Sequence, residues 1–442
     1  MSVRSSLMLL ATGLAMVGCA DILGLDEFTD QPKGGGGGSP STGGSTNGGA
    51  GVGGDMGGTG GGGGPPAECT PIADTTDLVD DPDLRFRRAY GAAIGTVAYS
   101  AAIAEGPSPK FYVVSMGNGT SPRTQSWSPQ NGGIDVFGVV ARSTTEIGVL
   151  VRANDAIGQL IVPVDSGGVL QIPANAFLAY PTPTECVGPD GYVRNVAPLL
   201  PIDPNNPRMA VECSKQDGSM TYLFVGDSNG LTRIDAAAGH PANLRVNRFA
   251  KAGDTEVMLL GDDPSQSSYV RLGPDFGAAQ LHVESGADRL SIPFSSINNP
   301  DGSTKFFLAT LAAGSFTPAR LFVRDVGVGQ AIDLIDDPIP GMTQIAQLET
   351  LADLVLLDPV VRLGPSLYSA GVNIEGTSVQ LSWMRESGEM LVRNMVVYDM
   401  DTPIDGAGAL PLATPGVPVL WSEKTGGTTK LRARTVLCVG GG

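Results

Sequence analysis

The feature that most constrains this fold is a long series of short strand-like runs separated by polar turns. From residue 110 onwards, runs of six to eleven residues rich in Val, Leu and aromatic side chains alternate with clusters such as KQDGS, DSNG and NNPDGS. Several runs alternate apolar and polar residues with a period of two, which is typical of half-buried strands. Stretches with the helical period of 3.6 are scarce, so the sequence predicts an all-β domain.

The runs give a specific set of expected strands. These are 110–116, 134–141, 146–153, 158–165, 208–213, 220–226, 255–261, 267–273, 279–285, 304–311, 319–326, 378–385, 389–399 and 417–423. A further stretch, TQIAQLETLADLVLL at 343–357, fits either a helix or two strands joined by a turn, and we favour the strands.

The expected strands recur in similar pairs along the chain. Segments 209–235, 248–273 and 304–326 share one plan of strand, polar turn and strand, at a coarse spacing of roughly 45 to 55 residues that is typical of a repeat architecture. Radial stacking of four-stranded sheets suits such repeats and leaves only short edges exposed. We therefore predict a β-propeller of six to eight blades over residues 69–442, with seven favoured. A large β-sandwich, or two in tandem, is the alternative.

The first eighteen residues have the pattern of an export signal. Residues 1–6 contain one cation and no acid, and residues 7–17 form an apolar run too short for a membrane-spanning helix of about 20 residues. The run ends in Met16-Val17-Gly18-Cys19, which resembles a bacterial lipobox, although Met16 stands where Leu is commoner. The resemblance implies cleavage before Cys19 and lipid on its thiol, and two or three acyl chains anchor a protein stably. An ordinary signal peptide, with Cys19 removed or in a disulfide, is the alternative.

A glycine-rich linker follows the predicted lipidation site. Nineteen of the 31 residues between Gly34 and Gly64 are glycine. Such a segment cannot bury enough apolar surface to fold, and residues 19–68 should form a flexible coil with a reach of about 30 Å. An acidic start, a Gly-rich linker and a secreted domain resemble the surface lipoproteins of myxobacteria and related Gram-negative bacteria. That resemblance, with Ala20 after Cys19, implies a protein anchored in the cell envelope, most simply in the outer membrane.

The charge of the chain narrows its partners. The formal net charge is −17, and because residues 1–68 contain Arg4, Lys33 and six acids, residues 69–442 have a charge of −13. Binding to nucleic acid requires clustered Lys and Arg, so we expect no nucleic-acid partner. The expected partners are the membrane, through lipid, and a protein or glycan ligand.

Four cysteines remain if Cys19 bears lipid. An even number of cysteines in an exported chain suggests two disulfides. Of the three pairings, we favour Cys69–Cys438, which joins the ends of the domain, and Cys186–Cys213, which closes a short loop. Spacings typical of zinc sites are absent.

The sequence offers only weak candidates for chemistry. Its two histidines are His240, in a loop, and His282, on the polar side of a predicted strand. Acidic clusters at Asp80, Asp81 and Asp83, at Asp262 and Asp263, and at Asp399, Asp401 and Asp405 contain the oxygen ligands that Ca²⁺ prefers, but turn formation explains them equally well. Trp127 is expected in a loop, either packed over a blade edge or stacking on a sugar. No catalytic residue, metal or cofactor is predicted.

These observations favour a binding or scaffolding module. The rival hypothesis is an extracytoplasmic hydrolase of glycans or esters that uses carboxylates or a histidine in the channel. Passive structural display is a third class. Convergence of a histidine or two acids in one deep pocket would favour the enzyme.

Overall fold

In the computed structural model, the folded unit spans Glu68–Gly440. The structure describes residues 68–439 apart from internal gaps, of which the longest are 236–245, 331–342 and 349–359. The expected leader, Cys19 and nearly all of the linker lie outside the described residues. In the described part of the chain, no helix is long and apolar enough to cross a membrane.

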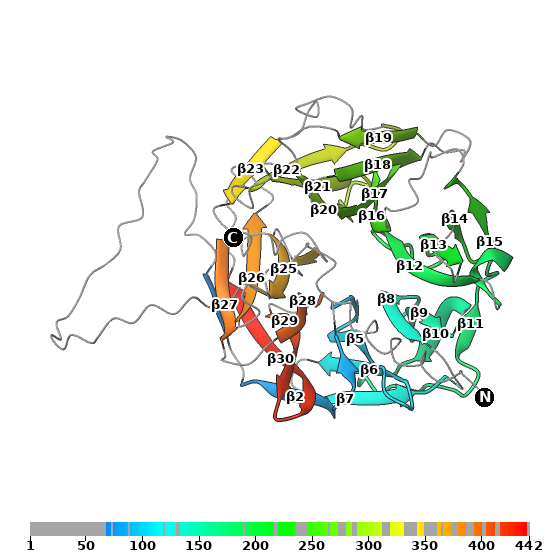
Figure 1. Cartoon of the computed structure of the whole chain (residues 1–442). Helices are drawn as coiled ribbons and strands as arrows, with labels where there is room; N and C mark the ends of the chain where they lie inside the picture. Colours follow the sequence, from blue (N-terminus) through cyan, green and yellow to red (C-terminus); the bar gives the residue numbers. More distant parts are fainter. Residues whose placement is uncertain are drawn as a thin grey trace, which may run out of the picture. The chain divides into compact units, whose positions relative to one another are not determined.

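The strands of this unit pair into blades of four or five strands, which follow one another around a ring (Figure 1). The first three blades, numbered along the chain, consist of the following strands. The first blade contains β3 (Leu84–Arg85), β4 (Gly91–Ile94), β5 (Val97–Ala104), β6 (Lys110–Gly117) and β7 (Thr120–Trp127). The second contains β8 (Ile134–Ala141), β9 (Glu146–Ala153), β10 (Ala156–Pro163) and β11 (Phe177–Ala179). A 3₁₀ turn, η2 (Thr184–Cys186), precedes the third, which contains β12 (Gly191–Leu200), β13 (Met209–Lys215), β14 (Thr221–Asp227) and β15 (Gly230–Arg233).

The next three blades repeat the same meander. The fourth blade contains β16 (Val246–Ala252), β17 (Thr255–Asp263), β18 (Gln266–Leu272) and β19 (Gln280–Glu284). The fifth contains β20 (Leu290–Asn298), β21 (Thr304–Leu311), β22 (Ala319–Val326) and β23 (Thr343–Leu348). The sixth contains β24 (Val361–Leu363), β25 (Ser366–Val372), β26 (Ser378–Arg385) and β27 (Arg393–Asp399).

The seventh blade joins the two ends of the folded unit. It contains β28 (Ile404–Ala409), β29 (Gly416–Thr425) and β30 (Thr428–Val439), and its outer strand is supplied by β1 (Glu68–Pro71) and β2 (Thr76–Asp81). Cys69 lies directly opposite Cys438 in this antiparallel pairing, and the two residues form a disulfide. The described strands thus form seven blades, which confirms the predicted propeller and its favoured blade number.

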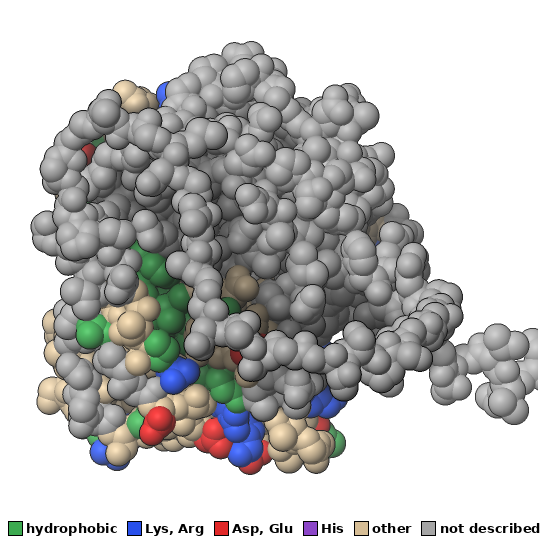
Figure 2. Space-filling view, turned by 90° about the vertical axis from the view of Figure 1, so that its left-hand side faces the viewer, with side chains coloured by type: hydrophobic (Ala, Val, Ile, Leu, Met, Phe, Trp, Pro, Cys, Tyr) green, Lys and Arg blue, Asp and Glu red, His purple; other side chains and the backbone are tan. Residues whose placement is uncertain are grey.

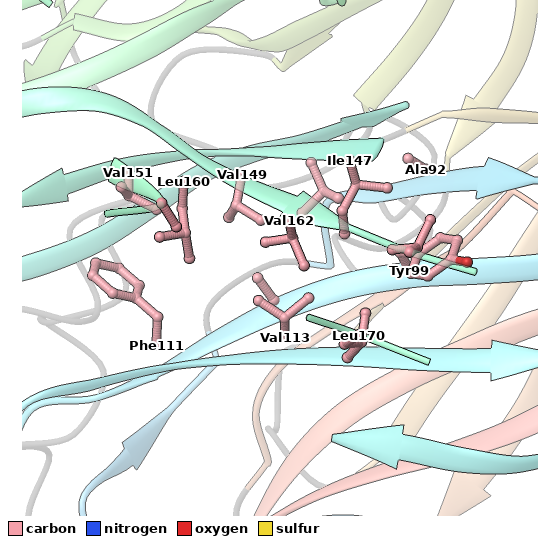
Figure 3. Packing of buried hydrophobic residues seen from close by; sticks show 14 of the residues in the cluster. Ala92, Tyr99, Phe111, Val113, Ile147, Val149, Val151, Leu160, Val162 and Leu170 are labelled. Atoms are coloured by element: carbon pink, nitrogen blue, oxygen red, sulfur yellow. The ribbon is translucent and has the colours of Figure 1, made fainter. Parts of the chain in front are cut away.

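Neighbouring blades pack through the faces of their sheets. Between the first and second blades, alternate residues of β5 and β6 meet those of β9 and β10 in a fully buried cluster that includes Tyr99, Phe111, Ile147 and Leu160 (Figure 3). At roughly 25 cal/mol per Å² of apolar surface, such burial is the main stabilising term of each joint. The ladder is antiparallel throughout the described blades except between β12 and β16, where a short parallel pairing joins the third blade to the fourth.

Most predicted strands are confirmed, and one local expectation was wrong. Segment 343–348 is β23, as the favoured interpretation required, whereas 349–357 lies outside the described residues. Trp127 is the last residue of β7 rather than part of a loop. Its ring stacks between Phe111 and Phe177, with centroid distances of 5.7 and 6.0 Å, because the edge of the first blade meets the second there. Trp127 therefore packs a blade edge.

Candidate functional site

A pocket of 280 Å³ lies where the innermost strands of several blades converge. Its walls come from the beginnings of β4 and β24 and from the last parts of β8, β12 and β20, which are far apart in the sequence. Most of the lining residues are half-buried, so solvent reaches the pocket. The lining residues are Tyr90, Gly91, Ala92, Ala93, Val139, Val140, Ala141, Leu200, Pro201, Ile202, Pro204, Ser295, Ser296, Ile297, Val360 and Val361.

Small residues leave the space for this pocket and let the surrounding chain approach. Glycine and alanine occupy the first three positions of β4, where larger side chains would fill the pocket. A Cβ atom on Gly91 would lie 2.5 Å from Leu410 Cδ2, and one on Gly138 would lie 2.5 Å from Ile202 Cδ1. Both contacts are too close for a side chain, so glycine at these positions permits the packing of the pocket wall.

The loop between β12 and β13, residues 201–208, forms one side of the pocket. It begins with a cis peptide bond between Leu200 and Pro201. The Asn206 side chain donates to Asp227 Oδ2 at 2.8 Å, and Arg208 forms an ion pair with Glu256 of the fourth blade at 2.7 Å. These polar contacts hold the loop in place, while Pro201, Ile202 and Pro204 line the pocket.

The pocket has an uncharged lining. None of its described lining residues is Asp, Glu, His, Lys or Arg. Its polar side chains are Tyr90, Ser295 and Ser296, and the Ser296 hydroxyl donates to the backbone carbonyl of Leu200. General acid–base catalysis requires a group that can exchange a proton near neutral pH, and the described part of the lining contains no carboxyl or imidazole group.

The best-defined buried carboxylates instead hold strands together. Asp81, at the end of β2, accepts hydrogen bonds from the Tyr112 hydroxyl at 2.6 Å and from Asp83 N–H at 3.0 Å, and Lys110 Nζ lies 3.7 Å away. Burial raises the pKa of Asp81, but the hydrogen bonds and the nearby lysine outweigh it and hold that pKa below its ordinary value. The effect on Tyr112 is the opposite, because burial and the hydrogen bond to the Asp81 carboxylate both raise the pKa of the Tyr112 hydroxyl, to about 12.

Glu423 on β29 makes a similar cluster at the joint of the sixth and seventh blades. Its carboxylate accepts hydrogen bonds from Arg432 at 2.7 Å, from the Thr425 hydroxyl at 2.7 Å and from the Tyr398 hydroxyl at 3.1 Å. Arg432 also lies 2.9 Å from Asp77 on β2, so the cluster ties the N-terminal strand to the closing blade. On the described part of the face in Figure 2, basic and acidic side chains likewise lie next to one another.

Of the other candidates from the sequence, those whose side chains the structure describes are not among the pocket-lining residues. Asp80 and Asp83 are exposed beside Asp81, and Asp399 is exposed at the end of β27. Asp262, Asp263 and Asp405 lie in β17 and β28, and His282 lies in β19; their side chains lie outside the described set, as do Asp401 and His240 altogether. No three His, Cys, Asp or Glu residues among those described are grouped to hold a metal ion.

The predicted disulfides are both present. Cys186, in η2, bonds to Cys213 of β13 in the buried joint between the second and third blades, and Cys69 bonds to Cys438 as described above. Sequence reasoning did not find the pocket residues Ser295, Ser296 and 200–204, because they lie on strands and a loop that no motif marks. The only sequence signal is the proline-rich segment PIDPNNP, which is incompatible with a strand.

Comparison with known proteins adds fold similarity only. No protein-family model and no curated protein matches this sequence. A protein of unknown function from Dyadobacter fermentans is similar over 84% of this chain and 99% of its own, with 10% identity and a TM-score of 0.42. The PQQ-bound aldose sugar dehydrogenase from Streptomyces coelicolor matches over 84% and 100%, with 10% identity and a TM-score of 0.36. Trypanosoma rangeli sialidase, in complex with the inhibitor DANA, matches over 79% of this chain and 54% of its own, with 8% identity and a TM-score of 0.41. At this level of similarity, none of these proteins assigns an activity to the chain.

Proposed function

We propose that this chain is a lipoprotein of the bacterial cell envelope whose propeller is a binding or scaffolding module for a ligand held in the central pocket. The observation that supports binding over catalysis is the uncharged lining of that pocket. The buried carboxylates Asp81, Glu212 and Glu423 are each paired with a cation within the protein. They therefore stabilise the blades, and the lining residues that the structure describes include no acid–base pair.

The proposed location in the cell envelope depends on the export signal in residues 1–18, and the two disulfides support it. Structural disulfides persist in oxidising compartments such as the periplasm and the cell surface. The tether would join the propeller at β1, beside the disulfide that closes the ring. The membrane that we propose is the outer membrane, which Ala20 after Cys19 favours.

The anchor is tested by replacing Cys19 with serine. We expect the wild-type chain to sediment with membranes and to show the mass of a lipid-modified cysteine, and the Cys19→Ser variant to appear in the soluble fraction. A variant that still sediments as the wild type does would overturn the anchor.

Catalysis is tested separately with 4-nitrophenyl butyrate and 4-nitrophenyl glycosides. We expect no turnover above background. Turnover that disappears when the pocket is filled by Ala93→Leu, with the fold unchanged by circular dichroism, would replace the binding module with a hydrolase.

A further inference from the structure

The pocket contains one polar group that the protein leaves unused. The Ser295 side chain lines the pocket and belongs to a residue that is only 1% exposed. Its hydroxyl makes no hydrogen bond with any described residue, whereas its neighbour Ser296 donates to Leu200. A hydroxyl at the wall of a pocket that solvent reaches can form a hydrogen bond with a molecule held there.

Ser295 and Ser296 pair in regular register with Phe307 and Phe306, directly after an irregularity in β20. Successive side chains on a regular strand point to opposite faces. The register between β20 and β21 shifts between Ile292 and Ser295, so a bulge interrupts the strand immediately before the two serines. Bulges re-aim side chains and are over-represented next to functional sites.

The rest of the lining restricts the charge and polarity of the occupant. An ion transferred into this pocket would lose hydration without meeting a counter-charge from any described lining residue, and uncompensated burial of charge is strongly unfavourable. A sugar ring would lose water from several hydroxyls, and the lining returns few hydrogen bonds to replace it. The volume of 280 Å³ lies just below the range of about 300–1,000 Å³ that is typical of ligand pockets, so the occupant is small.

We infer that the pocket binds a small uncharged molecule with an apolar body and one hydroxyl or carbonyl group, which forms a hydrogen bond with Ser295 Oγ. This inference rests on the proposed function in that the pocket is taken as the ligand site, and it narrows the ligand to one that is not a sugar. The apolar body would lie against the alanines and valines of β4 and β8, with the polar group directed towards β20.

The test compares two probes of equal chain length, hexan-1-ol and hexanoate, with methyl glucoside as the sugar. The full chain with Cys19→Ser is used so that detergent does not compete for the pocket, and binding is measured by ligand-observed NMR and calorimetry. We expect hexan-1-ol to bind with a millimolar or lower dissociation constant, and hexanoate and methyl glucoside to bind at least tenfold more weakly.

Three variants locate the binding. Ser295→Ala should weaken hexan-1-ol binding about 3- to 10-fold, which is the effect of one hydrogen bond. Ala93→Leu should abolish it by filling the pocket. Ala156→Leu makes the same change at a half-buried alanine outside the pocket lining and should leave binding unaltered.

Several results would overturn the inference. The first is the absence of hexan-1-ol binding at a ligand concentration of about 10 mM. The second is hexanoate binding as tight as hexan-1-ol binding. The third is hexan-1-ol binding that persists in an Ala93→Leu variant with the wild-type circular dichroism. None of these results bears on fractionation of the Cys19→Ser variant or on hydrolysis, so failure of this inference is distinguishable from failure of the proposed function.

Discussion

The joint between the first and second blades and the joint between the third and fourth are built from different interactions. The first is an apolar layer of fully buried aliphatic and aromatic side chains (Figure 3). At the second, β12 pairs with β16 through the backbone, and the fully buried carboxylate of Glu212 accepts a hydrogen bond from Val246 N–H at 3.1 Å. Arg194 neutralises this carboxylate at 2.8 Å, and the Asn195 side chain donates to the Val246 carbonyl.

The difference shows two ways in which a blade can pack specifically against the next blade. Apolar packing is non-directional, so it tolerates changes that keep volume. A buried hydrogen-bonded charge tolerates little, because removing one partner leaves the other desolvated. At the second joint, Glu212 and Asn195 satisfy the backbone groups of Val246 at the start of β16, just beyond the parallel pairing, and in this way they fix the register between two blades.

The seventh blade, which closes the ring, sharpens the comparison because a disulfide joins its strands. Removing this covalent bond should give the largest loss of stability. The residues of the Cys69–Cys438 disulfide are separated by 369 positions and those of Cys186–Cys213 by 27. In the chain-entropy treatment, removing these bonds costs about 6 and about 4 kcal/mol respectively. We expect Cys69→Ala/Cys438→Ala to lower the urea midpoint more than Cys186→Ala/Cys213→Ala does. Equal midpoints would contradict this assignment.

At the polar joint, Glu212→Ala should destabilise the protein by about 3–5 kcal/mol, because it removes the counter-charge of Arg194 and the acceptor of Val246 N–H. Glu212→Gln retains an oxygen acceptor and should have a smaller effect. Urea unfolding followed by tryptophan fluorescence measures both. If Glu212→Ala and Glu212→Gln lower the free energy of unfolding equally, the hydrogen bond to Val246 does not stabilise this joint.

At the apolar joint, Leu160→Ala should cost about 2–5 kcal/mol through lost burial and the cavity left behind. Leu160→Met nearly conserves volume and should cost less than about 1.5 kcal/mol. The same unfolding measurement applies. A methionine variant as unstable as the alanine variant would show that this joint is as strict as the polar one, and the contrast between the joints would be lost.

The smallest effect concerns pH at the polar joint. Burial raises the pKa of Glu256 above its ordinary value, although Arg208 and Lys251 oppose the shift. The folded state therefore binds a proton more tightly than the unfolded state, so Glu256 favours folding less as pH rises from about 4.5. We expect Glu256→Gln to gain stability relative to the wild type between pH 4.5 and 7, measured as the difference in urea midpoint. A difference that is constant or falls with pH would contradict the raised pKa.

Some strands of the blades were predictable from the sequence, and others were not. Predicted strands 134–141, 304–311 and 378–385 coincide with β8, β21 and β26, because turn residues and apolar runs are local signals. No strand was expected at β5, β12 or β20. Every residue of β5 is buried, and its VAYSAAIA sequence has neither alternation nor many large apolar side chains. Strands buried on both faces lose the period of two.

The sequence by itself indicated an all-β repeat fold, its favoured number of blades and two disulfides with a favoured pairing, because strand period, turn chemistry, and the number and positions of the cysteines can be read directly along the chain. The tertiary structure decided which groups meet across blades. Ser296 reaches Leu200 from 96 positions away, and Glu212 reaches Val246 from 34. These contacts depend on the angle and distance between sheets around the ring, and those quantities arise only when all blades pack together.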